Sequence, residues 1–259
     1  MRFCSLGSGS GGNALVVEAT SGGRTTRLLV DCGFSLRELD GRLARAGLAA
    51  SQFDAVFITH EHGDHIGSAI ALSRRDDLTV WMSVGTWRAI GQPALARDRL
   101  CFARDGEPIA VGDLELRPYT VPHDAAEPLQ LRCGDGARAL GVLTDAGCST
   151  THLVAQLQSC AALVLECNHD AALLASSRYP PALKARIGGR FGHLANAASA
   201  EVLAACYHPG LRHIVAAHLS EENNRPELAA LALSAACGGA PEDIVVAHPR
   251  HGVGWLDLH

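Results

Sequence analysis

The sequence predicts an α/β (α+β) fold in which a helix layer, two sheets and a second helix layer form a four-layer αββα sandwich. Short apolar runs of strand length occur along the chain, and segments with helical spacing of apolar residues lie between them. Strands flanked by helices bury their apolar faces in such layers. Hydrophobic residues make up 47% of the chain and charged residues 19%, which is typical of a compact globular protein. No repeat, linker or low-complexity tract divides the sequence, so we expect one domain over residues 1–259.

The expected elements follow in chain order. The first third begins with three strands separated by glycine-rich segments and continues with a helix, a buried strand and a second helix. These elements cover 3–6, 14–19, 27–30, 36–48, 55–58 and 66–74. The middle section is rich in strands, at 78–82, 114–121, 129–132 and 140–144. The last third alternates strands at 161–166, 213–217 and 244–247 with alanine-rich helices at 197–206 and 226–236.

Charge and cysteine content narrow the class of protein. The net charge of −5 gives no general attraction to nucleic acid, although a local basic groove is compatible with it. The nine cysteines are odd in number and no two have C-x-x-C spacing, so we interpret them as small buried side chains in a reducing compartment. No window of 18 or more consecutive apolar residues occurs, and a glycine-rich turn follows before a signal-peptide apolar region could form. We therefore expect a cytoplasmic protein without a membrane partner.

The segment 7–12 satisfies the pattern G-x-G-x-x-G, and Asp31 lies about twenty residues further on, as in dinucleotide-binding proteins. That motif must open a helix, whose N-terminus holds the pyrophosphate. Here the run 13–18 follows, which is better suited to a strand. We therefore favour a tight turn between strands, with no nucleotide cofactor, over cofactor binding.

The segment from His60 to His65 is unusually rich in side chains that can bind metal ions. Three imidazoles and two carboxylates fall within six residues at the end of an apolar strand. Buried without an ion, every nitrogen would need a hydrogen-bond partner, whereas divalent metal ions bind the same lone pairs. His60 and His62 lie two apart on an extended segment and can bind one ion, while Asp64 and His65 can reach a second. The imidazole-rich set suits hydrolysis with Zn²⁺ or Mn²⁺. The alternative is a polar surface turn with solvated histidines.

The run from Thr59 to His65 resembles the H-x-H-x-D-H signature of the metallo-β-lactamase superfamily. Similar landmarks follow in the expected chain order: 29–33 as a strand ending in Asp-x-Gly, then 122–123, 144–147 and 216–220. The resemblance covers nearly the whole chain and implies the metallo-β-lactamase fold with two divalent metal ions, Zn or Mn. It implies one ion bound by His60, His62 and His123, a second bound by Asp64, His65 and His218, and Asp145 bridging both.

Some of these residues have simpler interpretations. His123 could be a surface histidine at a strand end, and Asp145 could be the N-cap of a helix before Ser149. Both of these simpler interpretations are weaker because the histidine-rich run from Thr59 to His65 is present in the same chain. Asp31 is expected behind a ligating histidine as its hydrogen-bond partner, and Asp64 is expected to orient the attacking group as well as to bind metal. The other histidines are expected to be surface or structural residues: His152, His208, His213, His248, His251 and His259.

Within the superfamily the chain is similar to the YycJ/WalJ-like branch, whose members are regarded as nucleases. The stretches 7–13, 166–170, 192–194 and 218–224 carry this similarity. By analogy with tRNA 3′-processing nucleases, the resemblance implies that Glu166 and His193 form a relay in which His193 protonates the leaving alkoxide. Ala195 stands where a serine is expected after Gly-His-Leu, which puts help from a hydroxyl there in doubt.

The segment 171–193 lies beside the expected relay, and it contains basic residues but no acidic one. In an acidic protein this local reversal of charge favours a phosphate-bearing ligand. The alternative is a solvated helix face with ordinary basic residues. Tyr179 is a weak candidate for stacking on a base. The expected substrate-binding residues are Arg178, Lys184, Arg186 and Arg190.

The resulting hypothesis is a dinuclear-metal-dependent phosphodiesterase, a 5′-to-3′ DNA exonuclease in which a metal-bridging hydroxide attacks the phosphate in line. Its polarity rests on analogy with the family alone. One alternative is a small-molecule hydrolase of the same fold, acting on a thioester, a lactone or a cyclic phosphate, which needs an apolar cleft at the metals. The other is a non-catalytic metal-binding regulatory module.

Overall fold

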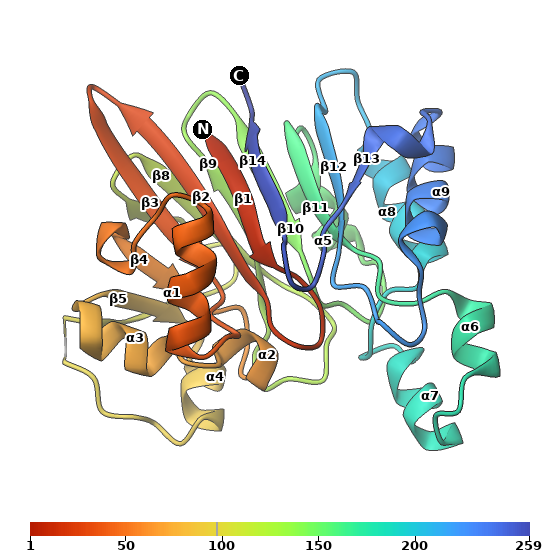
Figure 1. Cartoon of the computed structure of the whole chain (residues 1–259), viewed down its shortest axis with the longest axis horizontal. Coiled ribbons are helices and arrows are strands. Elements are labelled where there is room, and N and C mark those ends of the chain that lie inside the picture. The colour runs from red at the N-terminus through yellow and green to blue at the C-terminus, as the bar shows by residue number, and fades with distance from the viewer. Residues whose placement is uncertain (97) are drawn as a thin grey trace.

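A computed structural model describes residues 1–96 and 98–259, and it consists of two facing seven-stranded sheets with helices on their outer faces (Figure 1). The predicted αββα sandwich is confirmed. The first sheet has the order β14 (Val253–Asp257), β1 (Arg2–Gly7), β2 (Ala14–Ser21), β3 (Arg24–Val30), β4 (Ala55–Phe57), β5 (Thr79–Met82), β6 (Leu100–Phe102). The second has the order β13 (Ile244–Val246), β12 (His213–Ala217), β11 (Ala162–Glu166), β10 (Ala139–Leu143), β9 (Leu129–Gly134), β8 (Leu114–Thr120), β7 (Ile109–Val111).

Each sheet is parallel in one half and antiparallel in the other. In the first sheet β3, β4, β5 and β6 pair in parallel, and in the second β10, β11, β12 and β13 do. These strands are almost continuously apolar, because helices cover one face and the other sheet covers the second. The carboxyl ends of the parallel strands of both sheets therefore lie at one edge of the sandwich, where their loops meet.

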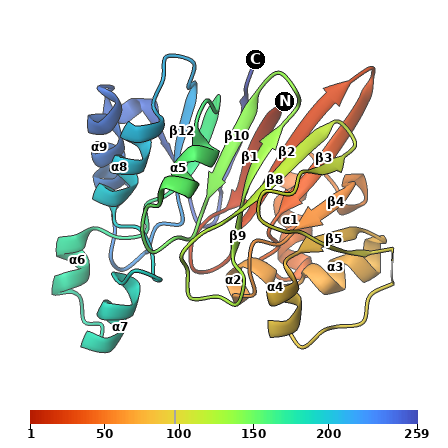
Figure 2. The same ribbon diagram turned by 180° about the vertical axis from the view of Figure 1, so that it is seen from behind.

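Three apolar clusters form the core. One lies between the sheets and contains residues of both, such as Val17 and Val164. The second packs the first sheet against α1 (Leu36–Arg45), α3 (Ala69–Asp76) and α4 (Val84–Ala89). The third packs the second sheet against α5 (Thr151–Leu157), α8 (Asn196–Cys206) and α9 (Pro226–Cys237), which Figure 2 shows from behind. One domain over residues 1–259 stays a prediction, and the cluster shared by both sheets supports it.

The remaining helices lie near the loop edge or connect elements. They are α2 (Gly63–Ile66), α6 (Ala171–Ser176), α7 (Pro181–Ile187) and two 3₁₀ turns at Ala50–Gln52 and Pro241–Asp243. Figure 1 shows α6 and α7 projecting beyond that edge as a small lobe. None of the helices among the described residues is both long enough and apolar enough to cross a bilayer.

The helix predicted over 66–74 is wrong in its bounds, because the structure divides this region into α2 and α3. Gly67 separates them with φ +32°, and a Cβ there would collide with the carbonyl oxygen of Cys32. The chain turns at this point so that the histidine-rich segment can pack against the loop after β3. Periodicity missed α4, α5, α6, α7, β6, β7 and β14, which are short or irregular.

The N-terminus of α8 lacks a side-chain cap, and Ala195 occupies that position with extended backbone angles. In the part of the chain that the structure describes, four other helices have a side-chain oxygen there, from Ser35, Ser83, Thr150 and Asp170. We expect Ala195→Ser to raise the free energy of unfolding by about 0.5–2 kcal/mol, because the hydroxyl can accept an unpaired N–H of the first turn. Urea unfolding of the metal-loaded protein measures the change. Thr150→Ala is the matched control and should lower stability by a similar amount, and an unchanged or lower midpoint for Ala195→Ser would contradict the prediction.

Candidate metal centre

The predicted site residues converge at the loop edge. Asp31 follows β3, Asp145 follows β10 and His218 follows β12. Glu166 is the last residue of β11, and the histidine-rich segment follows β4. The carboxyl ends of parallel strands share one edge of each sheet, so residues nearly 190 positions apart in sequence come together.

His60, His62 and His123 form a first group whose ligand atoms lie within 4.8 Å of one another. The Nε2 of His60 lies 3.0 Å from the Nδ1 of His62, and the Nε2 of His123 lies 3.3 Å from that same Nδ1. His60 and His123 are buried, whereas His62 is partly exposed. This group therefore faces the protein on one side and solvent on the other.

Asp64, His65 and His218 form a second group with ligand atoms at the same limiting distance of 4.8 Å. The Oδ2 of Asp64 lies 3.3 Å from the Nε2 of His218 and 3.6 Å from the Nε2 of His65. Asp145 lies between the two groups, with its Oδ2 2.9 Å from the Nε2 of His65 and its Oδ1 3.8 Å from the Nε2 of His123. The structure thus brings all seven predicted ligands together.

The residues of this centre fit divalent metal ions. Asp145 Oδ2 is buried and has no hydrogen-bond partner among the described residues, although the Nε2 of His65 lies 2.9 Å away. A buried carboxylate oxygen without a donor is costly, and a cation would satisfy it. Imidazole nitrogens with carboxylate oxygens and no thiolate form a set that suits Zn²⁺ or Mn²⁺.

The histidines of the centre differ in their electrostatics. Burial, together with the neighbouring histidines, lowers the pKa of His60 well below its usual value, which keeps its lone pair available. Burial acts in the same direction on His65 and His218, but the charge of Asp145 outweighs it and raises the pKa of each to about 10. Without ions these two histidines therefore hold protons between carboxylates, and metal binding must displace those protons.

Hydrogen bonds orient the ligating histidines. Asp31, with φ +61°, places its Oδ2 2.7 Å from the Nδ1 of His65 and accepts the N–H of Thr59 at 2.8 Å. The Nδ1 of His123 donates to the carbonyl oxygen of Gly192 at 2.9 Å. Each contact turns the Nε2 of its histidine toward the centre. Asp31 therefore lies where the sequence predicts it, behind a candidate ligand.

Glu166 and His193 form a pair at the side of the centre. Glu166 is fully buried, and its Oε2 accepts the N–H groups of Ala146 and Leu194 at 2.9 and 3.2 Å. Its Oε1 accepts the Nδ1–H of His193 at 2.7 Å. Burial would lower the pKa of His193, but the charges of Glu166 and Asp145 raise it to about 11. Its side chain remains 22% exposed, so His193 can offer a proton to a bound group.

A fourth group of close atoms combines Asp145, Glu166, His193 and His218. The Nδ1 of His193 lies 3.1 Å from the Oδ1 of Asp145, as well as 2.7 Å from Glu166. Since this nitrogen already donates to Glu166, we interpret His193 as a proton donor rather than a ligand. The alternative N-cap interpretation of Asp145 does not hold, because Thr150 caps α5.

Sequence reasoning missed two residues of the glycine-rich loop. The Oγ of Ser8 accepts the N–H of His218 at 2.8 Å, where His218 has φ +53°. Asn13 is buried, accepts the N–H of Gly9 at 2.9 Å and places its Nδ2 3.2 Å from the Nε2 of His65. The loop connects β1 to a strand, as predicted, and it also supports the second group of ligands. The run 7–13 carries part of the family resemblance, which was the available signal.

Asp124 was also missed. Its Oδ1 lies 3.6 Å from the Nε2 of His123, and its Oδ2 accepts the Nε–H of Arg186 at 2.6 Å. Arg186 belongs to the predicted substrate-binding set and is thereby held at the mouth of the centre. Lys184 donates to the carbonyl oxygen of Ala175 within the lobe. Arg178 and Arg190 are exposed on the same lobe and the loop after it.

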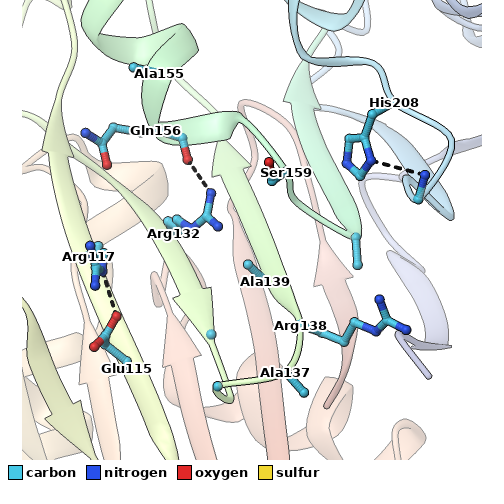
Figure 3. Close-up of a pocket in the computed structure, with 14 residues that line it drawn as sticks. Glu115, Arg117, Arg132, Ala137, Arg138, Ala139, Ala155, Gln156, Ser159 and His208 are labelled. Atoms are coloured by element: carbon cyan, nitrogen blue, oxygen red, sulfur yellow. Dashed lines mark hydrogen bonds and ion pairs between the residues drawn. The ribbon is translucent and has the colours of Figure 1, made fainter.

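A cavity of about 540 Å³ lies elsewhere, at the opposite ends of β9 and β10 (Figure 3). Two of its basic side chains have local partners: Arg117 donates to Glu115, and Arg132 donates to the carbonyl oxygens of Gln156 and Gln158. His208 also lines it. This cavity therefore does not belong to the metal centre.

The structure combines two facing mixed sheets with a histidine–aspartate centre at their loop edge, an arrangement suited to a metal-dependent hydrolase. The family model described as the metallo-beta-lactamase superfamily matches residues 7–155, and the chain belongs to this superfamily. The chain is 34% identical to a protein named exodeoxyribonuclease YycJ from Bacillus anthracis, over 90% of this chain and 88% of that protein. It is 30% identical to exodeoxyribonuclease WalJ from Streptococcus pneumoniae, over 88% of this chain and 85% of that protein.

The solved structures add evidence on the fold. The metallo-beta-lactamase fold protein YhfI from Bacillus subtilis aligns with a TM-score of 0.73 and 16% identity, over 99% of both chains. At that identity the likeness concerns the fold alone. The chain is a metal-dependent hydrolase of the metallo-β-lactamase superfamily, as its sequence predicted.

Proposed function

We propose that this hydrolase is a metal-dependent phosphodiesterase, a DNA exonuclease that acts from the 5′ end. The observation that carries the proposal is His193, whose Nδ1–H is held by buried Glu166 at 2.7 Å and whose partly exposed side chain lies at the edge of the metal centre. A deoxyribose oxygen that leaves a phosphodiester is strongly basic and needs a proton, whereas a thiolate leaves a thioester without one. The names of the two relatives support DNA as the substrate.

In this proposal the seven candidate ligands hold two divalent ions, Zn²⁺ or Mn²⁺, with Asp145 shared between them. When bound, these ions supply an activated water and stabilise negative charge on the phosphate. Asp64 orients the attacking group from its partly exposed position. Glu166 fixes the orientation of His193, and His193 donates its Nε2 proton to the leaving oxygen. The exposed guanidinium groups of the α6–α7 lobe then attract the phosphates of the strand.

We also propose that the protein works in the cytoplasm. All nine cysteines are free in the structure, and six of them are buried. Free buried thiols are typical of proteins from a reducing compartment.

The test is a panel of substrates with metal-loaded protein: DNA and RNA labelled at the 5′ or the 3′ end, bis-p-nitrophenyl phosphate, a glutathione thioester and a lactone. We expect progressive degradation of DNA with early release of the 5′ label, and loss of this activity in His62→Ala. His251→Ala, which changes an exposed histidine outside the centre, is the matched control and should retain activity. Turnover of the thioester or lactone alone would overturn the nuclease proposal, and no turnover with any metal would favour a binding module.

A further inference from the structure

Phe191 is one of the most exposed large apolar side chains of the described residues, with 57% of its surface accessible. Single exposed apolar residues are common, so exposure alone carries no argument. The position of Phe191 is more informative, because Phe191 directly precedes Gly192 and His193. Gly192 accepts the hydrogen bond of the candidate ligand His123, and His193 is the proposed proton donor. An aromatic ring is therefore presented to solvent within two residues of the reacting groups.

The backbone on which Phe191 sits is held on both sides. The N–H of Gly192 donates to the carbonyl oxygen of Gly189 at 2.9 Å, and the N–H of His193 donates to that of Ile187 at 2.8 Å. A Cβ at Gly192 would collide with carbonyl oxygens at the end of α7, and one at Gly147 would collide with the carbonyl oxygen of Arg190. The loop is thus packed between α7 and the loop after β10. A ring on such a support loses little freedom when a ligand binds.

The charges around this ring match a nucleotide. Arg190 is the preceding residue, and Arg186 lies in the last turn of α7. Both are exposed, and the segment contains no acidic residue. Asp124, from another loop, binds the guanidinium of Arg186, so Arg190 is the charge next to Phe191 in the chain. An aromatic ring offers a face to a base, and an arginine attracts its phosphate. Two residues of chain span at most about 7 Å, so the ring can lie one nucleotide from the group that His193 protonates.

We propose that Phe191 stacks on the base of the nucleotide that carries the leaving oxygen, and so positions the end of the strand in the metal centre. This inference rests on the proposed nuclease function. It assigns the stacking role to Phe191 instead of Tyr179, which is less exposed. Stacking is tolerant of base identity, because every base has an aromatic face. The proposal therefore predicts a preference for any base over none.

The test compares Phe191→Ala, Phe191→Leu and Phe191→Trp with the unchanged protein on single-stranded DNA whose terminal base is present or replaced by an abasic site. We expect Phe191→Ala and Phe191→Leu to lower kcat/KM on the intact strand about tenfold, mainly through KM, and Phe191→Trp to retain activity. On the abasic strand the variants should equal the unchanged protein. Leucine keeps an apolar side chain without a ring, so it separates stacking from simple burial. Tyr207→Ala removes another exposed aromatic residue and should change neither substrate.

A binding measurement separates this inference from the nuclease proposal. A strand with 2-aminopurine at its end should lose fluorescence when it stacks on the metal-loaded His193→Gln protein, in which turnover is slow and metal content is kept. Adding Phe191→Ala should remove most of that quenching. If DNA is degraded but Phe191→Ala is equally active on both strands, the stacking role is overturned and the nuclease stands. If the protein neither degrades DNA nor quenches the probe, both proposals fail.

Discussion

Asp145→Asn is expected to lower the metal content of the purified protein below two ions per chain and to reduce phosphodiesterase activity on the order of 10³-fold. The carboxylate lies between the two groups of ligands and is buried, and one of its oxygens has no hydrogen-bond partner among the described residues. An amide has nearly the same shape but carries no charge, so it binds a cation far less well. Metal analysis after dialysis and kcat/KM on DNA measure the two effects.

The matched control is Asp113→Asn, the same chemical change at an exposed aspartate that lies outside the four ligand groups. It should leave metal content and activity unchanged. Full occupancy together with full activity in Asp145→Asn would show that this carboxylate does not join the two half-sites. Circular dichroism shows whether Asp145→Asn is folded. If it is not, Asp145→Glu, which keeps the charge, is measured in its place.

His193→Gln is expected to reduce kcat on DNA by about 10² to 10⁴-fold while the metal content stays that of the unchanged protein. The histidine faces the centre from the side, and its Nδ1 is occupied by Glu166. A proton donor matters most for a basic leaving group. Bis-p-nitrophenyl phosphate releases a phenolate that departs without a proton, so its hydrolysis should fall far less than that of DNA.

Glu166→Gln provides the companion measurement for this prediction. Glu166 acts through His193, so its variant should show the same dependence on the leaving group with a smaller loss. Two outcomes would contradict the assignment of His193 as proton donor. One is an equal loss on both substrates, and the other is a drop in metal content, which would make His193 a ligand as the fourth group of atoms allows.

The buried strands could be predicted from the sequence, because each of them appears there as a short run of apolar residues. β10 is a continuous buried apolar run, and so are β11 apart from Glu166 at its end and β12 apart from His213 at its start. Short elements such as α2, at four residues, and β7, at three, are too brief to show a period. Their conformation depends on neighbours: α2 ends at Gly67, where the loop after β3 leaves no room for a side chain.

The histidine-rich segment by itself predicted a metal site, because simple packing does not readily explain so many imidazoles and carboxylates in one turn. Chain order and family resemblance then identified His123, Asp145 and His218 as candidate partners. Other features depended on tertiary packing alone. Ser8 supports His218, Asn13 reaches His65, Asp124 holds Arg186, and Phe191 is exposed beside His193. The three contacts join residues that are far apart in sequence, and the exposure of Phe191 depends on how its loop packs. They follow only when loops from both sheets meet at one edge of the sandwich.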